Sequence, residues 1–210
     1  MPQTIVMRNV SAALAAGLLM LAPALARAVE EAEYRVLKQD GAIELREYAP
    51  SIVAETVVDA DFEDAGNRAF RKLFRYIDGH NAAQQEIAMT APVSQSPAGR
   101  KIEMTAPVGQ SPADGGWAVS FMMPSSYTMD TIPRPSDPSV QLRAVPSHRA
   151  AVIRYSGFWS EGRYREHLQE LASWIVAQGL ERSGDPVWAR YDPPFKPWFM
   201  RRNEILIPVL

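Results

Sequence analysis

An internal repeat with a spacing of 97 residues is the sequence feature that most constrains the fold. Ile43-Glu44-Leu45-Arg46 recurs as Val140-Gln141-Leu142-Arg143, each followed by a proline turn, an apolar segment, an aromatic residue and an amphipathic helical pattern. Such repeats indicate supersecondary units that bury their apolar faces against each other. The sequence therefore predicts an α+β fold: a distorted antiparallel β-barrel with two amphipathic helices, formed by pseudo-twofold duplication of a strand–strand–helix–strand unit. The half-repeats are expected at about 33–115 and 116–210.

Hydrophobic periodicity locates the elements of each unit. Alternation over residues 43–48 is typical of a half-buried strand. Helical spacing of apolar residues predicts helices over about 61–77 and 160–178, the second ended by Gly179. Further strands are expected at 34–38, 52–58, 117–123, 140–143, 150–155, 188–191 and 204–209.

A second, shorter repeat lies between the first helix and the next strand. Residues 87–93 recur as 102–108, with a period of 15 residues, and each copy contains Met-Thr-Ala-Pro-Val. The pattern predicts two β segments joined by a linker of Pro, Gly and Ser. Pro92 and Pro107 require edge positions or bulges, because proline cannot donate to a sheet ladder.

Residues 1–28 have the composition of a secretory signal peptide. Arg8 supplies the positive charge, an apolar run rich in Ala and Leu follows, and Ala26-Arg27-Ala28 is an A-x-A cleavage signal. The run is too short and too rich in alanine for a membrane span. We therefore expect a cleaved signal peptide, one domain over 29–210, and a periplasmic or secreted protein without stable membrane insertion.

The charge balance of the mature chain disfavours polyanionic partners. Without Arg8 and Arg27, the 22 basic residues become 20 against 24 acidic residues, a net charge of −4. Binding to nucleic acid or to an anionic membrane generally uses an excess of positive charge. The sequence contains no cysteine, which excludes disulfides, thiolate metal ligands and thioether attachment of a prosthetic group.

Residues 191–204, near the C-terminus, combine prolines, aromatic side chains and cations. Pro193, Pro194 and Pro197 cannot continue a helix or a central strand, so the segment is predicted to be a stiff, extended loop. An apolar surface edged by cations suits a flat hydrophobic ligand with carboxylate tails. Alternatively, the loop only closes the end of the barrel, with its charges in solvent. The aromatic residues are Tyr191, Phe195, Trp198 and Phe199, and the cations are Lys196, Arg201 and Arg202.

With these motifs in place, residues 33–209 resemble the SOUL/haem-binding-protein family. The resemblance implies a distorted barrel of eight to nine strands with two helices, built from a duplicated half. It also implies reversible, non-covalent binding of haem or another tetrapyrrole. The motifs that carry the resemblance are Ile43-Glu44-Leu45-Arg46-Glu47-Tyr48, Ile87-x-Met89-Thr90-Ala91-Pro92-Val93, Gly157-Phe158, Tyr191-Asp192-Pro193-Pro194-x-Lys196-Pro197 and Arg201-Arg202-Asn203-Glu204.

The family resemblance also implies a ligand site between the first helix and the Tyr-Asp-Pro-Pro loop. By position, Phe70 and Phe74 would contact the ring together with the aromatic loop that contains Phe195, while Arg75 and Lys196 would meet the propionates. Some family members carry a further basic residue two turns before Arg75. Asn67 occupies that position here, which removes one expected propionate contact. The exported location and the doubled Met-Thr-Ala-Pro-Val motif are further departures from the family pattern.

Two histidines are candidate metal ligands. Iron in haem sites is ligated by His, Met, Cys or Tyr. His167 lies one turn from Tyr164 and Leu171, at the border of the second helix's inner face, and His80 follows the first helix. Each also fits a plainer role, as a structural histidine and a surface-loop residue respectively, so the sequence leaves the axial ligand open.

Enzyme motifs such as G-x-S-x-G, H-E-x-x-H and the P-loop are absent from the sequence. Together with the family resemblance, this absence favours a binding protein that buffers or transports haem. One alternative is a hydrolase or binder of small apolar compounds, related to gyrase-inhibitor-like and effector-binding domains and using a buried glutamate. Another is a barrel whose loop contacts a partner protein. The glutamates considered are Glu44, Glu47, Glu55 and Glu204, which strand spacing alone would leave exposed.

Overall fold

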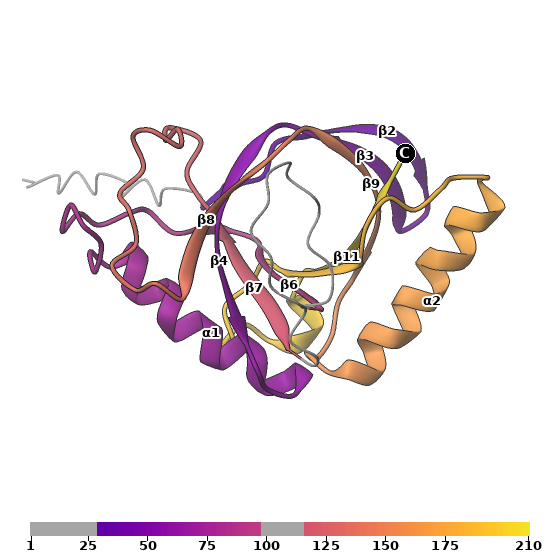
Figure 1. Ribbon diagram of the computed structural model, residues 1–210. Helices are drawn as coiled ribbons and strands as arrows, with labels where there is room; N and C mark the ends of the chain where they lie inside the picture. The colour runs from indigo at the N-terminus through magenta and orange to yellow at the C-terminus, as the bar shows by residue number, and fades with distance from the viewer. Residues whose placement is uncertain (1–28, 98–115) are drawn as a thin grey trace, which may run out of the picture.

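The computed structural model describes residues 29–97 and 116–210 (Figure 1). The predicted signal peptide and the second copy of the short repeat, 102–108, lie outside the described residues. The helices are α1 (Phe62–Ile77) and α2 (Glu161–Ala177), with a short 3-10 helix η1 (Trp198–Met200). The strands are β1 (Glu30–Glu31), β2 (Tyr34–Asp40), β3 (Ile43–Tyr48), β4 (Ser51–Val58), β5 (Thr90–Ala91), β6 (Val93–Pro97), β7 (Trp117–Met122), β8 (Val140–Val145), β9 (His148–Tyr155), β10 (Val187–Arg190) and β11 (Asn203–Val209).

Nine of these strands form one antiparallel sheet, in the order β2-β3-β9-β11-β10-β6-β7-β4-β8. In the two units, β3 corresponds to β8, β4 to β9, β6 to β10 and β7 to β11. With this correspondence, the strand order from β3 to β8 is symmetric about the pair β10 and β6. A pseudo-twofold axis therefore passes between β6 and β10, which confirms the predicted duplication. The topology places β7 in the first unit, so the boundary between the units lies after Met122 and not near residue 115.

The two units exchange the strands that carry the 97-residue repeat, β3 and β8. β3 pairs with β9 of the second unit, Ile43 opposite Ile153, and β8 pairs with β4 of the first unit, Val140 opposite Thr56. The strands of the repeated Ile-Glu-Leu-Arg and Val-Gln-Leu-Arg motifs thus each complete the sheet of the other unit. The repeat predicted the units but not this exchange of partners.

The sheet is strongly curved, and both helices lie on its outer side (Figure 1). The predicted α+β class, with two helices on a curved antiparallel sheet, is confirmed. Within the described segments, the end strands β2 and β8 are not hydrogen-bonded to each other, so the sheet arches without closing into a barrel.

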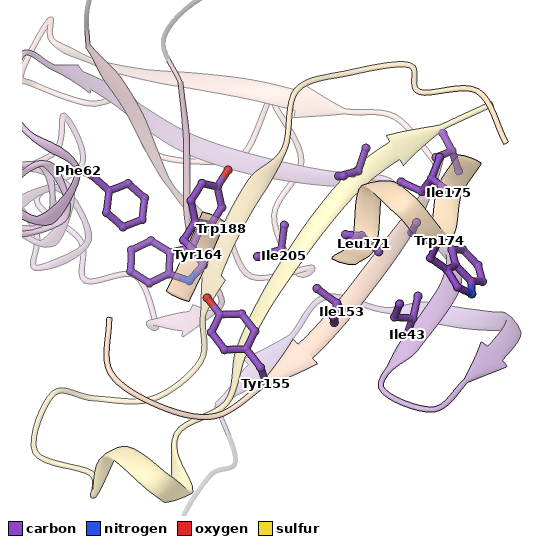
Figure 2. Packing of buried hydrophobic residues seen from close by; sticks show 13 residues of the cluster. Ile43, Phe62, Ile153, Tyr155, Tyr164, Leu171, Trp174, Ile175, Trp188 and Ile205 are labelled. Atoms are coloured by element: carbon purple, nitrogen blue, oxygen red, sulfur yellow. The ribbon is translucent and has the colours of Figure 1, made fainter. Parts of the chain in front are cut away.

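Two apolar clusters fill the space between the sheet and the helices. In one, Leu171 and Ile175 of α2 pack on Ile153 and Ile205 of the sheet (Figure 2). The other lies beneath α1 and includes Leu73 and the rest of the buried stripe of that helix. Phe62, the first residue of α1, belongs to the cluster beneath α2. It therefore joins the two units through side-chain packing.

Candidate ligand-binding site

α1 carries an aromatic edge beside its buried stripe. Phe70 is half-buried and packs edge-on against Phe121 of β7, with ring centroids 5.2 Å apart. Phe74, one turn later, stacks on Phe70 at 5.8 Å and is 41% exposed. Positions four apart lie above one another on a helix, so the two rings form a continuous apolar surface that runs from the core to solvent. The structure thus brings together the two predicted ring contacts.

This edge of α1 faces the junction of the two units. Gly66, one turn before Phe70, lies against Arg190 of β10, since a Cβ on Gly66 would be 2.8 Å from Nη1 of that arginine. Phe70 packs in the same cluster as Val93 of β6, which is the cross-strand partner of Arg190. The aromatic edge and the end of β10 therefore border the same part of the sheet, which we call the seam: the region where β6 and β10 meet beneath α1.

The loop that follows β10 is organised by Asp192. Its carboxylate accepts hydrogen bonds from Nζ of Lys196 and from the backbone N–H of Arg202, each at 2.5 Å. Arg201 ties the loop further by donating to the carbonyl oxygens of Lys196 at 2.7 Å and Pro194 at 2.5 Å. The predicted stiff loop is thus held by side-chain hydrogen bonds as well as by its prolines.

Trp198 of this loop packs against the segment that precedes α2. Trp198 stacks on Phe158 at 5.3 Å, and its carbonyl oxygen accepts a hydrogen bond from the N–H of Gly157 at 3.0 Å. Gly157 has φ +134°, a backbone conformation that favours glycine. Phe195 is 87% exposed and makes no aromatic contact with another described residue. The loop therefore presents a preformed apolar surface to solvent.

The other predicted contacts are less closely assembled. Arg75 and Asn67 lie exposed on α1. Lys196 forms an ion pair with Asp192, and within the described chain no hydrogen bond or ion pair joins Lys196 to α1. A propionate at Lys196 would therefore compete with an internal carboxylate.

The cation that lies within the seam, Arg190, was not predicted. Its guanidinium carbon lies 3.9 Å from the ring centroid of Trp188 and 5.0 Å from that of Trp159. It also donates a long hydrogen bond of 3.3 Å to Oε1 of Gln95. Burial lowers the pKa of Arg190 to about 10. In the sequence Arg190 reads as an ordinary strand-end residue, because its burial depends on α1 and on Trp159.

The histidines take the plainer of their two expected positions. His167 stacks on Tyr155 at 4.1 Å, and its Nδ1 lies 3.4 Å from Oε2 of Glu170. His80 is exposed after α1. In the two described segments, no group of three or more His, Asp or Glu side chains is arranged to hold a metal ion.

Glu204, one of the glutamates considered for catalysis, is fully buried on the sheet face opposite the helices, with 0% exposure. It accepts two hydrogen bonds from Arg46, at 2.8 and 3.1 Å, and others from Arg202 at 3.0 Å and from Tyr191 at 2.8 Å. Burial raises the pKa of Glu204, but the hydrogen bonds and charges of Arg46 and Arg202 outweigh it, so this pKa lies below its ordinary value. A carboxylate that stays ionised near neutral pH cannot serve as a general acid.

The other glutamates considered do not supply a buried acid either. Glu44 accepts a hydrogen bond from Arg46 at 2.6 Å, Glu47 pairs with Arg35 at 2.7 Å, and Glu55 pairs with Arg143 at 2.9 Å. All three retain exposure. Strand spacing was therefore wrong only for Glu204, and the environment of Glu204 is that of a structural ion pair.

Comparison with known proteins shows similarity over most of the chain. The family model described as "SOUL heme-binding protein" matches residues 29–208. Mouse "Heme-binding protein 2" is 28% identical over 175 residues, which cover 79% of this chain and 81% of the relative. "Heme-binding protein 1" of Xenopus tropicalis is 27% identical over 172 residues, which cover 80% of this chain and 84% of the relative.

Solved structures support the fold. The C-terminal domain of EcmrR superposes with a TM-score of 0.59 at 12% identity, covering 84% of this chain and 98% of that one. A hydrolase from Listeria innocua superposes with a TM-score of 0.54 at 11% identity, covering 83% of this chain and 94% of that one. At such low identity these likenesses concern the architecture alone. No helix in the described part of the chain has the length and apolar character needed to cross a membrane.

Proposed function

Because the chain belongs to the SOUL haem-binding protein family, we propose that it binds haem, or a related tetrapyrrole, reversibly and without a covalent bond. The observation that carries this proposal is the stacked pair Phe70 and Phe74, which presents an apolar surface at the seam. The absence of cysteine from the sequence excludes thioether attachment, which supports the non-covalent mode.

In this proposal the ring rests on Phe70 and Phe74, with the loop aromatic Phe195 near its edge. Burying roughly 400 Å² of apolar ligand surface contributes on the order of 10 kcal/mol before the costs of association. Binding therefore does not depend on a strong axial ligand. Arg75 and Lys196 are positioned on exposed elements where they can meet carboxylates in solvent-accessible positions.

We further propose that the protein buffers or transports its ligand after export to the periplasm. The composition of residues 1–28 supports this location. Fusion of residues 1–40 to alkaline phosphatase, which is active only when exported, tests it. Phosphatase activity comparable to a known secreted control is expected, and activity confined to the cytoplasmic background would refute export.

A haemin titration of residues 29–210, followed by absorbance, tests ligand binding. We expect a saturable one-to-one Soret change in the wild type and an affinity about tenfold lower for Phe74→Ala, because truncation of an aromatic contact costs about 1–3 kcal/mol. Arg75→Gln tests the propionate contact. Val176→Ala, an equally apolar surface truncation on α2 at a side chain 78% exposed, should leave the affinity unchanged.

The outcomes of this titration are distinct. A spectrum identical to that of haemin with an unrelated protein would refute haem binding. Binding that is unaffected by Phe74→Ala would keep the ligand and move its site away from α1.

A further inference from the structure

Arg190 is a half-buried cation with no carboxylate partner among the residues of the described segments. Desolvating a guanidinium is unfavourable unless an anion or several hydrogen bonds compensate for the lost water. Arg190 has five N–H donors, and its one side-chain hydrogen bond, to Gln95, is 3.3 Å long. Most of its N–H groups therefore have no partner among the described residues.

The side chains around Arg190 are aromatic, and two of them carry groups that can donate hydrogen bonds. The indoles of Trp188 and Trp159 lie at 3.9 and 5.0 Å from the guanidinium carbon. Trp188 is 1% exposed and Tyr155 is 9% exposed. The Trp188 indole N–H lies beside the Tyr155 hydroxyl, and neither group makes a hydrogen bond to any other described residue. A cation and two neutral groups able to donate hydrogen bonds thus lie in one apolar setting.

The backbone leaves room for this cation. Gly66 of α1 faces the guanidinium, and any larger residue would place its Cβ 2.8 Å from Nη1. Arg190 itself retains partial exposure, so its remaining N–H groups can be reached from outside. The same side of α1 continues from Gly66 to Phe70 and Phe74, which leads from the cation to the exposed aromatic surface.

From these observations we infer that Arg190 is the anchor of a carboxylate-binding site, which takes the acidic group of a ligand whose apolar body lies on Phe70 and Phe74. A planar carboxylate can accept two parallel N–H groups of one guanidinium, which makes the pair specific for this class of anion. The inference rests on the proposed function only where the ligand is a tetrapyrrole, which would present one of its propionates to Arg190. Arg75 and Lys196 remain available for the second propionate.

One arm of the test compares haemin with haemin dimethyl ester, in which both carboxylates are neutral. Wild-type protein is expected to prefer haemin about tenfold, because a charge-assisted hydrogen bond is lost in the ester. Arg190→Gln should lose most of this preference. Arg165→Gln also removes one positive charge, but from an exposed arginine of α2 that pairs with Glu161 at 2.8 Å, and should keep the preference. An undiminished preference in Arg190→Gln would overturn the inference.

The second arm does not depend on haem. 2-Naphthoate is a small planar carboxylate, and methyl 2-naphthoate is its neutral control. The sequence contains five tryptophans, so their indole N–H signals can be followed individually by ¹⁵N NMR. We expect naphthoate, but not its ester, to shift the signals of Trp159 and Trp188 saturably, and Arg190→Gln to abolish these shifts.

These arms separate failure of the inference from failure of the proposed function. Naphthoate shifts without haemin binding would refute haem as the ligand and keep the carboxylate site. Haemin binding that Arg190→Gln leaves unchanged, together with no naphthoate shift, would refute the carboxylate site and keep haem as the ligand. The variant is expected to melt close to the wild-type temperature, because Arg190 is partly exposed and makes no ion pair in the described segments. If Arg190→Gln does not fold, Arg190→Lys replaces it, because lysine keeps the charge but cannot donate two parallel hydrogen bonds to one carboxylate. The preference for haemin over its dimethyl ester should then be smaller than in the wild type.

Discussion

At the scale of single residues, the two most informative groups are two charges in opposite situations. Glu204 is surrounded by Arg46, Arg202 and Tyr191, which together saturate its two oxygens. Arg190 is desolvated by indoles and has one long hydrogen bond. A saturated buried ion pair indicates a structural role, whereas a half-buried cation without a carboxylate partner indicates a place for a ligand.

The lowered pKa of Glu204 predicts a loss of stability in acid. Native Glu204 binds its proton more weakly than a glutamate in the unfolded chain, whose pKa is about 4.3. Its stabilising contribution is therefore complete above about pH 4.3 and is lost as the pH falls through the lower native pKa. Urea unfolding between pH 7 and pH 3 should show Glu204→Gln less stable by about 3 kcal/mol at pH 7, with the difference from wild type narrowing in acid.

Glu47→Gln is the control for this experiment. Glu47 pairs with Arg35 in a largely exposed position, so its replacement should change the free energy of unfolding by less than about 1 kcal/mol. A difference between wild type and Glu204→Gln that stays constant from pH 7 to pH 3 would contradict the assigned direction of the pKa.

At the scale of elements, the loop between β10 and β11 is a preorganised surface. Asp192 binds both Lys196 and the backbone of Arg202, and Gly157 binds the carbonyl oxygen of Trp198. The exposed aromatic residues are therefore held in place before any ligand arrives, which reduces the entropy cost of binding.

Asp192→Ala should loosen this loop without unfolding the domain. The substitution removes the acceptor of the Arg202 N–H and the partner of Lys196, so amide hydrogen exchange over 193–202 should accelerate, while exchange in α1 and β9 stays slow. Hydrogen exchange with mass spectrometry measures both. Asp185→Ala, at an exposed position in the loop before β10, is the matched control. Unchanged exchange over 193–202 would show that the prolines alone fix the loop.

At the scale of the whole molecule, the two units form one cooperative structure. β6 and β10 pair across the pseudo-twofold axis, and Phe62 of the first unit stacks on Trp188 at 4.5 Å and on Tyr164 at 5.2 Å in the second. Loss of either unit would expose the core of the other, so we expect a single unfolding transition.

Phe62→Ala tests this coupling. Truncation of a buried Phe generally costs about 3–5 kcal/mol, and here the cavity lies where the units meet. Tryptophan fluorescence and far-UV circular dichroism should still report coincident urea transitions, shifted together to lower denaturant. Phe74→Ala on the same helix should cost less than about 1 kcal/mol, since Phe74 is 41% exposed. Separate transitions for the two probes would show that the units unfold independently.

The sequence predicted features that depend on local interactions and missed those that depend on contacts between distant segments. The bounds of β3 and α1 depend on local periodicity, and the predicted segments 43–48 and 61–77 match the observed elements closely. The exchange of β3 and β8 between units depends on pairing over about a hundred residues, which a local pattern does not encode. Alternation placed Glu204 on a solvated face, but it cannot show that Arg46 and Arg202 cover that residue.

For the candidate site, Phe70 and Phe74 could be named because the family resemblance fixes their positions on one helix. Arg190 could not, because its significance depends on Gly66, Trp159 and Trp188, which come from three separate segments. The one local signal was a basic residue immediately after two apolar strand positions, which is common at strand ends.

The exchange of β3 and β8 between the units also bears on how such a chain could have arisen. A half-length ancestor with the strands of one unit would have its β3-like strand separated from the rest of its own sheet. Two identical copies could satisfy each other by the same exchange, as a symmetric homodimer with a twofold axis where β6 and β10 now meet. Gene duplication and fusion would then have preserved a subunit interface as the centre of a single chain. The seam beneath α1 would descend from an intersubunit groove, and Arg190 and Gly66 could diverge there independently once the two copies no longer had to be the same.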